Sequence, residues 1–176
     1  FVTLITAFAN LFGLGGAPLC AMARGKGNRE GAQGIMVNAG FMLLLSGAVL
    51  TVLGIAFHRP LLYLFGASEV TYPYASSYIV IYLIGTLCVM LSLGLNPYIN
   101  CQGFARIGML TVALGAAANI VLDPIFIFAL HLGVRGAAIA TVLSQFLSAA
   151  WVVKFLTGKK AELKLDFRGF RPDWHC

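Results

Sequence analysis

The stretch 108–130, GMLTVALGAAANIVLDPIFIFAL, holds one carboxylate, Asp123, inside an otherwise apolar run. Such a run is typical of a membrane-crossing helix, which needs about 20 apolar residues. An ionisable side chain at membrane depth costs at least about 2.5 kcal/mol on insertion scales, so Asp123 needs a partner or a function. Asn119 lies one helical turn earlier and shares the helix face of Asp123. We expect both side chains to face protein or water rather than lipid.

The composition of the whole chain agrees with a membrane protein. Hydrophobic residues make up 60% of its 176 residues and charged residues 10%, and the mean hydropathy is +0.89. A soluble globular domain is far more polar than this, because it must cover its surface with polar side chains. Here the lipid-facing surface replaces that polar exterior.

Five apolar segments are long enough to span a bilayer, and we predict helices at residues 1–23, 34–57, 74–101, 108–130 and 136–157. The third is long enough to tilt or bend. Charged and turn-forming residues gather in the connectors, for example at His58-Arg59-Pro60. The sequence therefore predicts an all-α membrane protein, an antiparallel bundle of five transmembrane helices over 1–157, followed by a basic cytoplasmic segment at 158–176.

The basic residues predict the orientation of this bundle, since Lys and Arg flanking the spans collect on the cytoplasmic side. Only Arg59 and Arg135 fall at one end of the alternation. The others fall at the opposite end, namely Arg24, Lys26, Arg29, Arg106, Lys154, Lys159, Lys160, Lys164, Arg168 and Arg171. We interpret the net charge of +6 as a sign of orientation and of contact with anionic lipid headgroups, not of nucleic-acid binding. We predict a multi-pass protein of the plasma membrane.

The chain starts inside its first predicted helix, at Phe1, on the side opposite the cytoplasmic tail. An earlier helix would be needed to bring a cytoplasmic N-terminus across the membrane. We therefore expect the sequence to be a fragment of a longer transmembrane protein.

Enzymatic and metal-binding patterns are missing from the spans. The four cysteines, Cys20, Cys88, Cys101 and Cys176, form no C-x-x-C pair and are expected to be small buried hydrophobes. The three histidines are isolated, which argues against a zinc site. No second aspartate joins Asp123 at a spacing suited to a metal-bound diphosphate. We predict neither an enzyme nor a bound cofactor.

A polar cluster around Asp123 is the candidate site. Pro124 follows directly and lacks the N–H that would bond the Ile120 carbonyl, so we expect a kink there. Counting about 1.5 Å per residue from the short connector near His131 places Asp123 and Thr141 at comparable depths. Asp123, Asn119 and the Thr141 hydroxyl could then bind a cation, with Gln145 a weaker candidate. Kinked helices near the midplane are where transporters place such sites.

Several motifs occur in an order that resembles a known family. They are Gly13-Leu-Gly-Gly16-Ala-Pro18 leading into Arg24-Gly-Lys-Gly-Asn28, Gln102-Gly103, Asn119-x-x-x-Asp123-Pro124, and Gly133-Val-Arg135-Gly136-Ala137-Ala138 with Thr141. Together they resemble the multidrug and toxic compound extrusion (MATE) family of cation-coupled efflux transporters, especially its bacterial branch. The resemblance covers the whole chain.

The resemblance implies a transporter of two six-helix lobes, of which this chain would supply helices two to six of the N-terminal lobe and the start of the linker. It implies that Asn119, Asp123 and Thr141 bind the coupling ion, Na⁺ or H⁺, together with an aspartate of a first helix outside this chain. The implied partners are drug-like, often cationic compounds, the lipid bilayer, and the missing first helix and C-terminal lobe.

Other functions stay open at this point. A lipid-linked oligosaccharide flippase of the same superfamily would need intramembrane arginines to hold a lipid diphosphate, and the spans contain none. An intramembrane enzyme would need clustered acids or a nucleophile at depth. A non-transporting membrane scaffold would tolerate neutralisation of Asp123.

Overall fold

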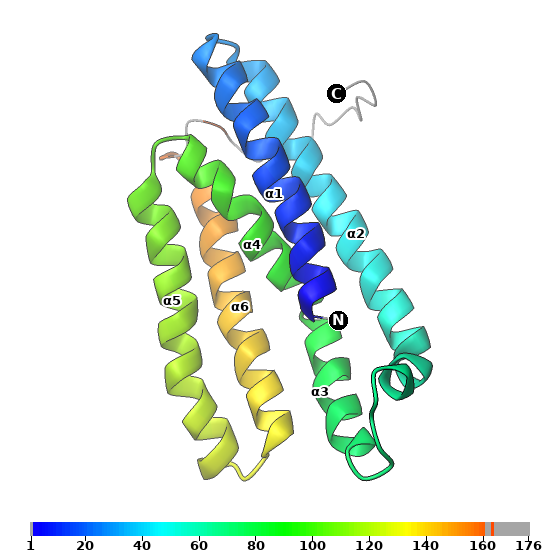
Figure 1. Cartoon of the computed structure of the whole chain (residues 1–176). Helices are drawn as coiled ribbons and strands as arrows, with labels where there is room; N and C mark the ends of the chain where they lie inside the picture. Colours follow the sequence, from blue (N-terminus) through cyan, green and yellow to red (C-terminus); the bar gives the residue numbers. More distant parts are fainter. Residues whose placement is uncertain (1, 161–162, 164–176) are drawn as a thin grey trace.

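The computed structural model describes residues 2–160 and 163, and all regular structure in this part of the chain is helical (Figure 1). The elements are α1 (Val2–Gly25), α2 (Arg29–Leu64), α3 (Tyr72–Ile84), α4 (Thr86–Cys101), α5 (Ala105–Pro124), the π-helical turn η1 (Ile125–Ala129) and α6 (Val134–Thr157). Four are long and apolar enough to cross a membrane, and the bent pair α3 and α4 makes a fifth span. The predicted all-α bundle is confirmed.

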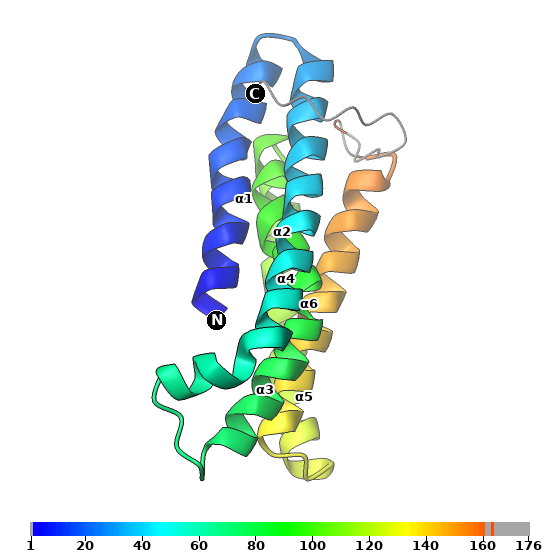
Figure 2. The same cartoon turned by 90° about the vertical axis from the view of Figure 1, so that its right-hand side faces the viewer.

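The second helix is longer than predicted. We expected His58-Arg59-Pro60 to be a connector, and this is wrong, because α2 continues through Pro60 to Leu64. A proline inside a helix removes one hydrogen bond and bends the axis rather than always ending the helix. Here the last turns of α2 turn away from the bundle axis (Figure 2), and the apolar side chain of Leu62 remains buried.

The third predicted span is broken into α3 and α4, which meet at Gly85 with a bend of 56°. The Thr51 hydroxyl on α2 bonds the Leu83 carbonyl at 3.2 Å, close to the break. A Cβ atom on Gly85 would lie only 2.7 Å from Cγ2 of Val142 on α6. The break therefore lies against α6, and the absence of a side chain at Gly85 permits this contact.

Helix α4 forms the centre of the bundle and contacts α1, α2, α5 and α6. Its fully buried side chains include Met90, Leu95 and Tyr98. Helix α1 approaches closely, because a Cβ on Gly13 would lie 2.8 Å from the Gly94 carbonyl oxygen. The Tyr98 hydroxyl donates to the Phe12 carbonyl at 2.8 Å and joins the same two helices. Small residues thus allow the close packing that membrane helices need.

The connectors lie at two ends of the bundle, as the charge pattern requires. The α1–α2 turn, the α4–α5 turn and the end of α6 lie at one end, and the α2–α3 connection and the turn before α6 lie at the other (Figure 1). The α1–α2 turn extends beyond the α4–α5 turn in the same view. Asn28 starts α2 there by accepting a hydrogen bond from the Gly31 amide at 2.9 Å.

Most of the predicted basic segment 158–176 lies outside the described residues. Leu163 is described, and its side chain is buried. Its backbone N–H donates to Oε1 of Gln102 at 3.1 Å, while the Gln102 amide contacts the Met36 sulfur at 3.8 Å. At Leu163 the chain therefore packs on the α4–α5 turn.

Candidate functional site

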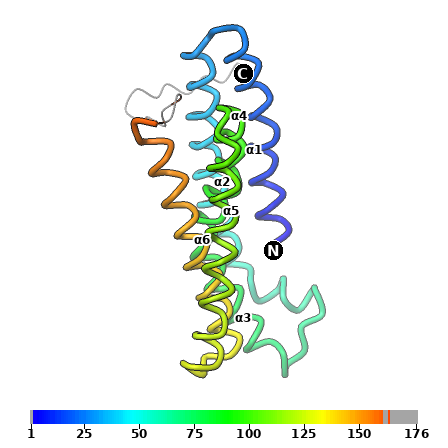
Figure 3. The backbone as a smooth tube through the Cα atoms, turned by 90° about the vertical axis from the view of Figure 1, so that its left-hand side faces the viewer, coloured from blue at the N-terminus to red at the C-terminus, as the bar shows by residue number. Residues whose placement is uncertain are grey.

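Contacts between α5 and α6 set the level of the candidate residues. The Ser148 hydroxyl on α6 donates to the Thr111 carbonyl on α5 at 3.2 Å. Near the start of α6, a Cβ on Gly136 would lie 2.6 Å from the Phe126 carbonyl oxygen. Figure 3 shows the two helices side by side and antiparallel between these points. Asn119 and Asp123 on α5, and Thr141 on α6, all lie in the intervening stretch.

Asn119 and Asp123 are in direct contact. When the Asn119 amide is oriented with its nitrogen toward the carboxylate, this nitrogen lies 3.1 Å from Oδ1 of Asp123 and 3.2 Å from Oδ2 and donates to both. The opposite amide orientation would place the amide oxygen against the carboxylate, which is unfavourable. Both side chains are half-buried, whereas the neighbouring Ile120 is 73% exposed. The polar pair thus lies at the edge of the α5–α6 contact rather than on the outermost face of α5.

Pro124 is the last residue of α5, and the π-helical turn η1 follows it directly. The wider turn is visible in its hydrogen bonds, since the Leu130 N–H reaches the Ile125 carbonyl at 3.1 Å. Single π-helical turns inside α-helical segments are often found at functional sites. The helix therefore changes its winding at Ile125, two residues after the carboxylate.

The hydroxyl hydrogen of Thr141, the third predicted site residue, is already engaged in a hydrogen bond. Its hydroxyl donates to the Ala137 carbonyl of its own helix at 2.9 Å. Among the described residues it forms no hydrogen bond with Asp123 or Asn119. Its lone pairs remain available, and an oxygen with free lone pairs can act as a ligand for a cation. Gln145, the weaker candidate, is half-buried one turn further along α6.

The α3–α4 break lies next to Thr141, and the sequence does not predict this position. Gly85 packs against Val142, which is adjacent to Thr141, and the next residue, Thr86, is fully buried. Irregular backbone at membrane depth is tolerated where it is buried in protein or lines a cavity. The sequence feature that could have indicated the break is the pair Gly85-Thr86, near the middle of the overlong predicted span 74–101.

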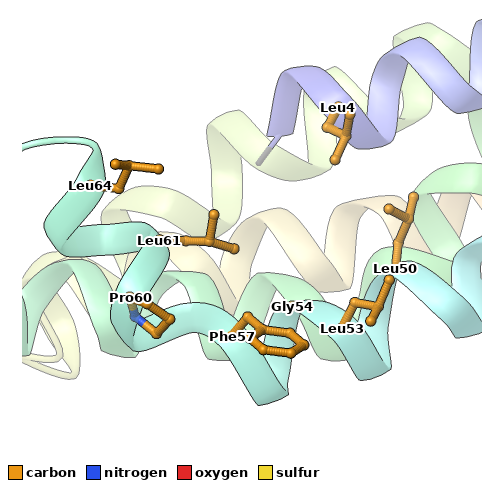
Figure 4. Close-up of a pocket in the computed structure, with 8 residues that line it drawn as sticks. All are labelled: Leu4, Leu50, Leu53, Gly54, Phe57, Pro60, Leu61 and Leu64. Atoms are coloured by element: carbon orange, nitrogen blue, oxygen red, sulfur yellow. The ribbon is translucent and has the colours of Figure 1, made fainter.

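Two cavities of the described residues lie away from this polar pair. The larger one, about 1070 Å³, follows α1 and α2 and has Asn38, Gln33 and Tyr98 among its lining residues. The second, about 500 Å³, is an apolar notch between the start of α1 and the bent end of α2, with Leu4, Phe57 and Leu64 at its edges (Figure 4). Neither Asp123 nor Asn119 lines either of these two cavities.

Comparison with known proteins identifies the family. A sequence model described as MatE matches residues 1–125. The multidrug export protein MepA of Staphylococcus haemolyticus is 28% identical over 96% of this chain and 37% of its own length. An FAD transporter of Shewanella oneidensis is 32% identical over 85% of this chain and 35% of its own.

A crystal structure of MATE in the bent conformation superposes with a TM-score of 0.92 and 30% identity, covering 98% of this chain and 39% of that one. The chain thus spans well under half the length of the relatives it matches, in agreement with the expectation of a fragment. Since the family model matches more than half of it, the chain belongs to the MatE family of multi-pass membrane transporters.

Proposed function

We propose that this chain is part of a cation-coupled antiporter that exports drug-like, often cationic, organic compounds across the plasma membrane while Na⁺ or H⁺ enters. Family membership supports a transporter of this kind, and relatives include multidrug export proteins. The observation that carries the proposal is the contact of Asn119 with Asp123 on a membrane-spanning helix. A carboxylate at this depth needs a role that compensates for its desolvation.

The coupling ion would compete with Asn119 for Asp123. With the amide nitrogen oriented toward Asp123, the amide hydrogens bond the carboxylate oxygens and help to stabilise its charge. Binding of Na⁺ would require the amide to turn by about half a rotation, so that its oxygen faces the ion together with the carboxylate and the Thr141 hydroxyl oxygen. Protonation of Asp123 would remove the charge instead. Either event changes the hydrogen bonds of the pair, and a site can sense occupancy in this way.

Pro124 and η1 would transmit that change. They lie directly after Asp123, where the helix already departs from regular α geometry. The carbonyl of Phe126 in η1 lies against Gly136 at the start of α6. A change in the winding of η1 would therefore displace the first turn of α6, and occupancy of Asp123 would be coupled to the packing of two helices.

The remaining parts of such a transporter lie outside this chain. By the family resemblance, a first helix would add a further carboxylate to the ion site, and a second lobe would complete the drug cavity. The larger cavity along α1 and α2 is a candidate for the part of the drug-binding surface contributed by this lobe. Transport is therefore a property of the complete protein, and each test below uses it.

Replacing Asp123 by Asn in the complete protein should abolish ion-driven efflux, because the neutral amide neither binds a proton nor neutralises a cation. The measurement is efflux of a fluorescent cationic compound from membrane vesicles at matched protein amounts. Glu69→Gln is the control, since Glu69 is an exposed carboxylate in the α2–α3 connection and its neutralisation should leave efflux unchanged.

Undiminished efflux in Asp123→Asn would contradict the proposed role and favour a scaffold. Imposing sodium and proton gradients separately on the same vesicles would identify the coupling ion. Transfer of a lipid-linked oligosaccharide that does not depend on Asp123, without efflux of the cationic compound, would favour the flippase alternative.

A further inference from the structure

Two cysteines from distant parts of the sequence meet at the end of the bundle that carries most of the basic residues. Cys20 on α1 and Cys101, the last residue of α4, place their sulfur atoms 3.5 Å apart. Cys20 is fully buried and Cys101 is half-buried. The sequence predicts small buried apolar cysteines, and nothing in their spacing brings 20 and 101 together.

The surroundings hold these sulfurs facing each other. The Cys20 thiol contacts the Ala32 carbonyl at 3.5 Å, and the Cys101 thiol lies 3.3 Å from the Tyr98 carbonyl. One turn beyond Cys20, Nη1 of Arg24 donates to the Cys101 carbonyl at 2.9 Å. A side chain from α1 thus joins the two helices next to the thiols, which keeps Cys20 and Cys101 adjacent.

We propose that Cys20 and Cys101 form a reversible disulfide under oxidising conditions, which links α1 covalently to α4. A disulfide requires an S–S distance of about 2.05 Å, so the sulfurs must approach by about 1.5 Å. The chain can accommodate this, because α4 ends at Cys101 and turns at Gly103, where φ is +87°. Terminal helical turns adjust more easily than helix interiors.

The chemistry is a two-electron oxidation of two thiols. With the membrane-permeant diazene diamide, one thiol adds across the N=N bond. The sulfur of the second then attacks the first sulfur, and the hydrazine leaves with both hydrogens. A thiol reductant reverses the step. The cytosol is normally reducing, so the pair would be dithiol at rest and disulfide under oxidative stress.

The test uses the complete protein in membrane vesicles, with every cysteine other than Cys20 and Cys101 replaced by serine. After diamide, denaturation and alkylation, mass spectrometry should find most of the protein with neither thiol alkylated and with a peptide linking α1 to α4. Dithiothreitol should restore two alkylated thiols. The matched control keeps Cys88 and Cys101 instead. Cys88 is also half-buried on α4 and bonds no other sulfur among the described residues, so this control should not link.

Quantitative alkylation of Cys20 and Cys101 after both diamide and copper-phenanthroline treatment would overturn the proposal, and so would equal linkage in the control. A consequence for transport rests additionally on the proposed function: efflux should fall several-fold on oxidation and recover on reduction. Linkage without a change in efflux would remove that consequence alone, because the cross-link is measured independently of transport.

Discussion

In the proposed site, single side chains would act through their oxygen atoms. Thr141 and Ser144 make this testable, since each hydroxyl donates to the carbonyl four residues earlier in α6, at 2.9 Å and 2.7 Å. If Thr141 also serves as an ion ligand, Thr141→Val should raise the half-saturating concentration of the coupling ion by about tenfold, which corresponds to about 1.4 kcal/mol for one lost polar contact. Ser144→Ala should leave it unchanged. Equal effects of the two substitutions would assign Thr141 to packing alone.

At the scale of helices, the break between α3 and α4 should depend on the space at Gly85. Gly85→Ala places a Cβ 2.7 Å and 2.8 Å from the two Val142 methyl carbons, and such overpacking typically costs about 1–3 kcal/mol. Thermal denaturation of the purified complete protein should show this loss, and adding Val142→Ala should recover part of it. Gly34→Ala is a suitable control, because a Cβ there meets nothing within 4 Å. Strictly additive effects of the Gly85 and Val142 substitutions would show that the two positions do not interact.

The helices also show what could be predicted from the sequence. Apolar run length alone located α1, α5 and α6 closely, because a bilayer imposes a length on each span. It failed at Pro60, where α2 continues to Leu64, and at Gly85, where the break lies against Val142 from a helix much later in the chain. At the site, the spacing of four residues placed Asn119 and Asp123 on one helix face and so predicted their contact. The η1 turn and the Cys20–Cys101 pair could not be predicted, since both require coordinates of neighbouring helices.

For the whole molecule, the arrangement of connectors predicts sidedness. Single cysteines at Lys26 and Glu69, both exposed, would mark opposite ends of the bundle (Figure 1). In intact cells that express a complete protein lacking other cysteines, a membrane-impermeant maleimide should label Glu69→Cys. Lys26→Cys should react only after the membrane is permeabilised, because the basic end is expected in the cytoplasm. The reverse pattern would invert the predicted orientation.

The length of α2 has a practical consequence. Its 36 residues amount to about 54 Å of helix at 1.5 Å per residue along an axis that bends near Pro60, which exceeds the roughly 30 Å of hydrocarbon. Because the turn from Arg24 to Arg29 extends beyond the α4–α5 turn (Figure 1), we expect it to stand clear of the lipid, next to exposed polar side chains. A short epitope inserted after Gly27 would provide a binding site for an antibody fragment. Particle images of the complete membrane protein could then be aligned on the bound fragment.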